Sequence, residues 1–143
     1  MIQRIQSIFM FLAGMSGVSA VFLPFATTGQ DTSFAELQDG VYNAFDSHFV
    51  FGIFALVAIV ALVNIFLFKS RPTQLLINTL MMLVTLVGIG LMAYPFLGFL
   101  EANMSLVPGI GAWAALLICL FLMLANRGIR KDSRLVKSMD SLR

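Results

Sequence analysis

Residues 81–100 read MMLVTLVGIGLMAYPFLGFL, a run of twenty residues without a formal charge. The uncharged region around this run is longer, because no Asp, Glu, Lys or Arg occurs between Arg71 and Glu101. At ~1.5 Å of rise per residue, about twenty helical residues cross a hydrocarbon core of ~30 Å. Three further stretches lack charge in the same way, at residues 5–30, 47–68 and 102–126. The pattern predicts four transmembrane helices.

The overall composition also indicates a membrane protein. The chain has 143 residues, of which 59% are hydrophobic and only 11% charged, so it is too apolar for a soluble domain of this size. Its apolar runs are continuous and do not alternate with period two, which favours helices over a barrel. We therefore expect an all-α membrane protein, an antiparallel four-transmembrane-helix bundle. Its transmembrane domain covers residues 1–126, with spans at about 5–25, 48–68, 75–98 and 107–126.

The basic residues all lie on one side of the predicted bilayer. They precede span one, separate spans two and three, or follow span four: Arg4, Lys69, Arg71, Arg127, Arg130, Lys131, Arg134, Lys137 and Arg143. The two other loops contain no Lys or Arg and hold most of the acidic residues. Because Lys and Arg in short loops set orientation, we expect both termini to be cytoplasmic and the two acidic loops external.

The first span has some features of a signal peptide. Arg4 precedes the apolar run, and Val18-Ser19-Ala20 resembles a cleavage site. The apolar sequence nevertheless continues through Phe25, so we interpret it as a retained span that Pro24 ends or bends.

Small and polar residues within the spans predict contacts between helices. Ala13 and Gly17 form a small-xxx-small pair in span one, and Gly111 and Ala115 form another in span four. We expect these pairs to pack against neighbouring helices. Asn64 lies about one turn from the cytoplasmic end of span two, where water or an interhelical hydrogen bond can satisfy its amide.

The larger external loop contains the signature of a short helix. Ser33 and Glu36 have the spacing of a capping box. Four apolar residues follow at helical intervals: Phe34, Leu37, Val41 and Phe45. The pattern predicts a short external amphipathic helix. It either docks a partner or covers the ends of the transmembrane helices as a lid.

Residues 127–143 predict a basic amphipathic cytoplasmic C-terminal helix. Its basic residues fall on one helical face, while Asp132 falls among the apolar residues. No basic residue stands three or four positions from Asp132, so we expect it to pair with Arg4 or Arg71. The basic face has three interpretations: a solvated helix that sets topology, a site for anionic lipid headgroups, or a docking site for a cytoplasmic partner. It contains no aromatic residue, so we expect no specific nucleic acid as a ligand.

The cytoplasmic segments together predict one composite contact surface. It would meet a partner protein or lipid headgroups through polar and charged side chains from both termini and the turn at 69–74. These are Gln3, Arg4, Gln6, Lys69, Arg71, Gln74, Arg127, Arg130, Lys131, Asp132, Arg134, Lys137 and Arg143.

The residues needed for catalysis or coupled transport are missing from the sequence. No span carries Asp, Glu, Lys or Arg near its middle, where pumps and ion-coupled carriers place such groups. His48 is the single histidine, and the single cysteine, Cys119, lies in the middle of span four, so we identify no nucleophile–His–acid set. One His with scattered carboxylates also lacks the ligand count and spacing of a zinc site. We expect no catalytic residues, no metal site, no cofactor and no enzymatic activity.

The two ends of the chain resemble those of a known family. The opening MIQRIQSI, the closing RGIRKD and LVKSMDSLR, and the turn KSR followed by Gln74 and Asn78 are similar to an uncharacterised family of Bacteroidota. Its members are small four-span inner-membrane proteins, catalogued as a domain of unknown function. Where members of the family often have a basic residue, this sequence has Ser141. The resemblance implies a bacterial inner-membrane location, and it identifies neither an activity nor catalytic residues.

These observations favour an accessory or scaffolding role. The spans are chemically plain, whereas the distinctive residues are cytoplasmic, as in a non-enzymatic subunit of a larger membrane assembly in protein export or envelope biogenesis. Its partners would be membrane proteins and membrane lipid. The alternative is a small lipid- or quinone-binding protein or carrier, with the ligand between spans near Pro24, Tyr94 and Pro95. Neither interpretation specifies an oligomeric state.

Overall fold

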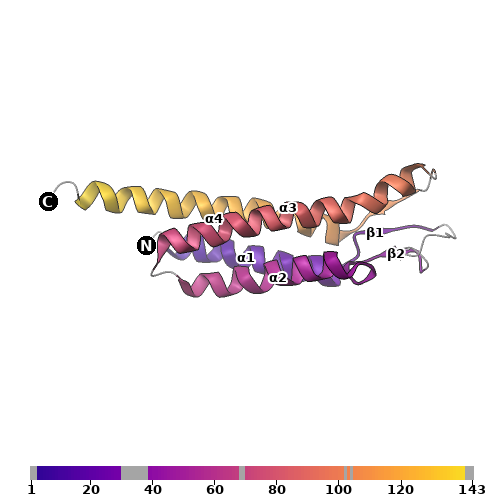
Figure 1. Ribbon diagram of the computed structural model, residues 1–143, viewed down its shortest axis with the longest axis horizontal. Helices are drawn as coiled ribbons and strands as arrows, with labels where there is room; N and C mark the ends of the chain where they lie inside the picture. The colour runs from indigo at the N-terminus through magenta and orange to yellow at the C-terminus, as the bar shows by residue number, and fades with distance from the viewer. Residues whose placement is uncertain (1–2, 30–38, 68–69, 102, 104, 141–143) are drawn as a thin grey trace.

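Four α-helices make up most of the chain that the structure describes. The computed structural model describes residues 3–29, 39–67, 70–101, 103 and 105–140. For residues 3, 4 and 135–140 it describes the backbone alone. The helices are α1 (Gln3–Phe22), α2 (His48–Asn64), α3 (Arg71–Glu101) and α4 (Ile110–Asp140). They lie side by side along the long axis of the molecule (Figure 1). All four are long and apolar enough to cross a membrane.

Prolines explain several of the helix boundaries. α1 stops at Phe22, as expected from Pro24, which lacks an N–H and keeps the residue before it out of the helical conformation. α3 takes Pro72 in its first turn, where an N–H would have no helical acceptor. Pro95 was expected near the end of a span, but α3 continues past it for six further residues to Glu101.

α4 extends well beyond the span predicted at 107–126. It runs without a break to Asp140 and includes most of the residues predicted as a separate tail. No proline follows Asn126, and Arg, Lys and Leu in this part of the chain favour a helix. The described part of the tail therefore continues the candidate span in one unbroken helix.

Small residues allow the helices to approach one another closely. α1 and α3 each contact both α2 and α4. A Cβ added at Gly17 would lie 2.9 Å from the Cβ of Ala58, so α1 and α2 meet at this glycine. A Cβ added at Gly88 would lie 2.6 Å from Cγ2 of Ile53, which fixes the separation of α2 and α3. The packing role predicted for Gly17 is confirmed.

A small antiparallel sheet covers one end of the helices, which we call the sheet end. Its strands are β1 (Ala26–Thr27), β2 (Val41–Tyr42) and β3 (Val107–Pro108), in the order β2-β1-β3. Ala26 lies opposite Tyr42 on one side and Pro108 on the other. The hydrogen-bonding continues into α4, where Gly111 N–H donates to the Pro24 carbonyl at 2.9 Å.

This sheet corrects part of the predicted external helix. Val41 lies in β2 and Phe45 in the 3-10 helix η2 (Ala44–Asp46), whereas Phe34 and Leu37 lie outside the described residues. Gly40 adopts a φ of 73°, a left-handed conformation that ends any helix before Val41. The N–H and C=O groups of Val41 and Tyr42 are then free to pair with β1.

The sheet end contains an aromatic core. The ring of Tyr42 lies 5.6 Å from that of Phe25, 5.9 Å from that of Phe96 and 6.2 Å from that of Phe99. Phe54 packs against Phe25 with the ring centroids 5.9 Å apart. Tyr42, Phe25, Phe54 and Phe99 are almost completely buried. Pairing with β1 is what places Tyr42 between α1 and α3.

The outer surface of the helices is largely apolar. Only 22% to 39% of the residues in the four candidate spans are buried within the protein, although their sequences are strongly hydrophobic. Large exposed side chains include Ile8 on α1, Ile59 on α2, Leu83 on α3 and Leu116 on α4. A continuous apolar surface of this kind suits a hydrocarbon environment, so the fold is that expected of a membrane protein.

Candidate functional site

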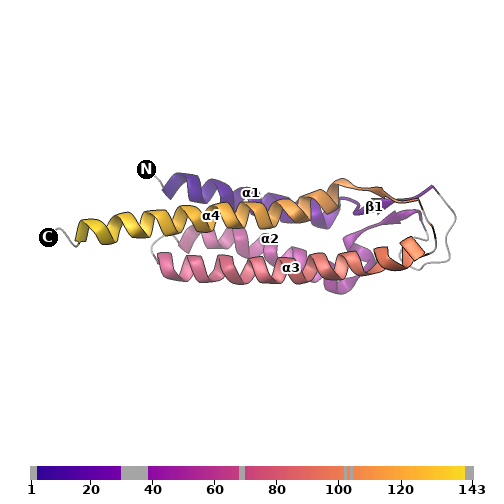
Figure 2. The same cartoon turned by 90° about the horizontal axis from the view of Figure 1, so that it is seen from above.

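The end opposite the sheet, which we call the termini end, carries a projecting basic helix. Here α1 and α3 begin and α2 and α4 end, and the last part of α4 extends beyond the other three helices (Figure 2). Arg127, Arg130, Lys131 and Arg134 are exposed on this helix. Their spacing of three and four residues places them on one face. We call these four side chains the basic face.

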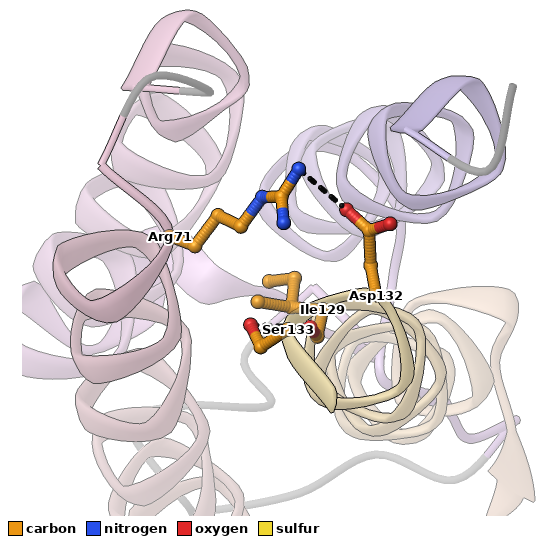
Figure 3. Close-up of polar contacts among 4 residues, drawn as sticks. All are labelled: Arg71, Ile129, Asp132 and Ser133. Atoms are coloured by element: carbon orange, nitrogen blue, oxygen red, sulfur yellow. Dashed lines mark hydrogen bonds and ion pairs between the residues drawn. The ribbon is translucent and has the colours of Figure 1, made fainter. Parts of the chain in front are cut away.

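An ion pair attaches this extension to α3. Nη2 of Arg71 lies 3.1 Å from Oδ2 of Asp132, and the two side chains are 29% and 14% exposed (Figure 3). The pairing predicted for Asp132 is thus confirmed, with Arg71 as the partner. Because α3 begins at Arg71, its guanidinium can reach across to α4.

Packing holds the same turn of α4 on its inner side. Ile129 is 1% exposed, and the Ser133 hydroxyl donates to the Ile129 carbonyl at 2.9 Å. Gly128 faces α1, where an added Cβ would lie 2.8 Å from Cγ of Gln6. The inner side of α4 is therefore fixed to α1 and α3, while the basic face points away from them.

A buried amide network lies just inside this end. Nδ2 of Asn64 donates to the Gln74 carbonyl at 3.2 Å and to Oδ1 of Asn78 at 2.8 Å. In return, Nε2 of Gln74 donates to the Asn64 carbonyl at 3.1 Å. Asn64 and Asn78 are 0% exposed. The interhelical hydrogen bond expected of Asn64 is confirmed, and it joins the end of α2 to the first turns of α3.

The network reaches the other two helices as well. Nδ2 of Asn126 on α4 donates to Oγ1 of Thr79 on α3 at 3.4 Å. Nε2 of Gln74 also lies 3.7 Å from Sδ of Met10 on α1. Sequence reasoning missed Asn126, because a single Asn at the end of an apolar span usually faces water or headgroups. The available signal was the position of Asn126 next to Arg127, where the apolar run ends and a polar side chain can pair with a neighbouring helix.

Two residues of the predicted contact surface are not at the surface. Gln6 is 4% exposed and Gln74 is 3% exposed, so a partner cannot reach either side chain. Both were expected at the surface because they are polar and lie near the predicted cytoplasmic boundary. The structure instead uses Gln74 in the amide network and packs Gln6 against Gly128.

Several other predicted site residues lie where their side chains are not described. These are Gln3, Arg4, Lys69, Lys137 and Arg143, together with Phe34 and Leu37 of the predicted docking helix. Of the remaining docking residues, Val41 is half-buried, and Phe45 is exposed beside the rings of Phe22 and Phe51.

The described residues contain no group of three His, Cys, Asp or Glu side chains that could hold a metal ion. A groove of about 300 Å³ runs along the outer side of α3, and its lining is almost entirely apolar. It is formed by Pro72, Leu75, Leu76, Thr79 and Leu80. The groove is thus at the termini end, whereas Pro24, Tyr94 and Pro95, expected to line a ligand site, are near the sheet end.

The termini end therefore presents exposed cations at its surface and keeps its neutral amides buried between the helices. No curated protein matches the chain, and no solved structure matches it. One family model matches residues 2–142, which is nearly the whole sequence. The chain therefore belongs to the family described as Domain of unknown function (DUF4293).

Proposed function

We propose that this protein is a non-enzymatic accessory or scaffolding subunit of a larger assembly in a bacterial inner membrane. In this proposal the four helices insert as an antiparallel bundle, with both termini cytoplasmic. The distribution of charge supports this orientation, because Arg71 and the four cations of the basic face lie at the termini end. At the sheet end the exposed charges are acidic, at Asp39, Asp46 and Glu101.

The observation that carries the proposal is the straight continuation of α4 past the other helices (Figures 1 and 2). From Arg127 to Asp140 the helix rises by roughly 20 Å, at ~1.5 Å per residue. A helix that continues along the bundle axis leaves the headgroup region within a few turns. In the proposed orientation Arg127 and Arg130 are nearest to the lipid headgroups, whereas Arg134, about 10 Å farther along the helix than Arg127, is left for a protein partner.

The partner is accordingly a protein. Its contact segment is acidic, because it must complement four cations on one face of α4. As the accessory-subunit proposal requires, this segment is the cytoplasmic part of another membrane protein. Membership in the Bacteroidota, an inner-membrane location and a role in protein export or envelope biogenesis are parts of the same proposal.

Site-specific crosslinking tests the proposal. A photo-crosslinking residue at position 134 should capture one membrane protein in stoichiometric amount, through an acidic cytoplasmic peptide. The same residue at position 48, which is exposed at the sheet end, is the matched control.

A charge variant then shows whether the captured protein recognises the basic face or only lies near it. The triple variant Arg127→Gln, Arg130→Gln, Arg134→Gln keeps six of the nine basic residues and with them the orientation signal. It should reduce the crosslinked product at least tenfold. A monomer without a stoichiometric partner, or a partner bound equally well by the triple variant, would contradict the proposal.

A second candidate function is the binding of a lipid or quinone, which the groove on α3 favours. Its almost entirely apolar lining and its volume of about 300 Å³ suit a hydrocarbon chain. Leu76→Trp would fill the groove, whereas Leu86→Trp changes an exposed residue of the same helix outside it. Extraction of the purified protein should recover a stoichiometric lipid or quinone that only Leu76→Trp removes. Equal recovery from both variants would exclude this function for the groove.

A further inference from the structure

Each of the four helices contributes a buried carboxamide to the termini end. Gln6 comes from α1, Asn64 from α2, Asn78 from α3 and Asn126 from α4. Their exposed fractions are 4%, 0%, 0% and 7%. We call these four side chains the amide layer. Gln74 on α3 is a fifth buried carboxamide at this end, in helices whose other buried residues are mostly apolar.

The orientation of Asn64 and Asn78 follows from a backbone group. The Gln74 carbonyl can only accept, so the amide nitrogen of Asn64 must face it. The same nitrogen donates to Asn78, which must therefore present its oxygen. Turning either amide around would place two donors or two acceptors face to face. Oδ1 of Asn64 and Nδ2 of Asn78 are consequently directed away from this pair.

A hydroxyl group fixes Asn126 in the same way. Oγ1 of Thr79 uses its hydrogen to donate to the Leu75 carbonyl at 2.8 Å. It can then only accept from Asn126, whose nitrogen must face it. Oδ1 of Asn126 is therefore left for another donor.

Four buried atoms of the amide layer have no hydrogen-bond partner among the described residues. Two are nitrogens that donate, Nδ2 of Asn78 and Nε2 of Gln6, and two are oxygens that accept, Oδ1 of Asn64 and Oδ1 of Asn126. Buried polar groups in proteins are nearly always paired, and membrane proteins have no solvent in the hydrocarbon region to supply the pairing. These atoms therefore indicate a ligand.

We propose that the amide layer is a binding site for internal water. The unpaired atoms require both donors and acceptors, and water supplies two of each. The site is neutral, which disfavours an ion: Arg127, next to Asn126 in the sequence, is exposed on the basic face, and Arg71 and Asp132 neutralise one another. Internal water typically makes about three hydrogen bonds to groups of this kind. The inference does not depend on the proposed partner, because it concerns side chains that no partner can reach.

Water contacts in the intact protein test the proposal. The full-length chain is labelled with ¹⁵N in Asn and Gln side chains, placed in lipid nanodiscs, and its nuclear Overhauser effects to water are recorded. The side-chain NH₂ groups of Asn78 and Gln6 should show cross-peaks to water with the sign of a long-lived, bound molecule. Asn103, which is exposed at the sheet end, should show only the sign of bulk water.

Two variants assign the signals. Asn78→Leu and Gln6→Met each remove one donor and should abolish only the corresponding peak, and labelling by residue type assigns the signals if either variant fails to fold. Cross-peaks at both buried amides support the site. Buried NH₂ groups without any contact to water, beside a normal signal from Asn103, would overturn it.

Discussion

At the scale of single residues, the termini end depends on polar side chains that are buried but paired across helices. Asn64 has no exposure and still satisfies its amide nitrogen twice, through Asn78 and the Gln74 carbonyl. Arg71 and Asp132 form an ion pair that joins α3 to α4. A buried polar side chain stabilises a structure only while its partner is present, because a side chain left unpaired keeps the full cost of its desolvation.

Loss of Arg71 should destabilise the protein through Asp132. We expect Arg71→Ala to lower the free energy of unfolding by about 1–2 kcal/mol, between the values for exposed and for buried pairs. Unfolding followed by the fluorescence of Trp113, the single tryptophan, measures the change. Arg134→Ala, which removes an exposed cation of the basic face, is the control and should change stability little. Equal effects of the two substitutions would refute a role for the pair.

Asn64 and Asn78 should behave as a coupled pair. Asn64→Leu leaves an amide oxygen of Asn78 and a backbone carbonyl without a donor, so we expect a loss of about 2 kcal/mol. In the Asn64→Leu background, Asn78→Leu should lower the free energy of unfolding less than it does in the unchanged protein, because the Asn78 amide has already lost its partner. A double-mutant cycle measures the coupling, and strictly additive effects would show that the two amides act independently.

At the scale of the elements, glycines set how closely the helices pack and the sheet sets where α4 starts. Gly111 lies so near the carbonyls of Leu23 and Pro24 that no larger residue fits without moving backbone. Its own N–H donates to the Pro24 carbonyl, so the end of α1 and the start of α4 are joined directly. α4 is therefore anchored at both ends: by the Gly111 hydrogen bond at the sheet end and by the Asp132 ion pair at the termini end.

Substitution by alanine should change the stability of the protein in opposite directions at Gly17 and Gly52. Gly17→Ala places a methyl group against Ala58 on α2, so we expect it to lower stability by about 1–2 kcal/mol through overpacking. Gly52 has nothing within 4 Å of its added Cβ, so Gly52→Ala should raise stability by about 0.5–1 kcal/mol through helix propensity. Chemical denaturation of both variants in one detergent compares them, and a shift of the same sign would show that Gly17 is not a packing contact.

At the scale of the whole molecule, the two ends differ in charge and in structure. The termini end carries the basic face and the amide layer, whereas the sheet end carries acidic residues and an aromatic core. Between them the surface of the helices is apolar. This polarity agrees with the orientation that the Lys and Arg positions predict.

The orientation can be tested by labelling single cysteines in intact cells. In a Cys119→Ser background, Asp39→Cys should react with an impermeant thiol reagent added outside, because Asp39 is exposed at the sheet end. Arg134→Cys should react only after the inner membrane is made permeable. The reverse pattern would place the basic face on the outer side, and the proposed cytoplasmic partner would be excluded.

Hydropathy, charge and proline were enough to locate four helices, the end of α1 shortly before Pro24 and the ion pair of Asp132. These features are local, or follow from the high cost of placing a charge in hydrocarbon. The sheet was not foreseen, since strands of two residues have no periodicity and Thr27 pairs with Val107, a residue distant in the chain. Of the amide layer, only the interhelical hydrogen bond of Asn64 was foreseen, and the rest was missed for the same reason. Whether Gln6 and Asn126 are exposed or buried depends on which helices pack beside them, and that is decided by contacts between residues distant in the chain.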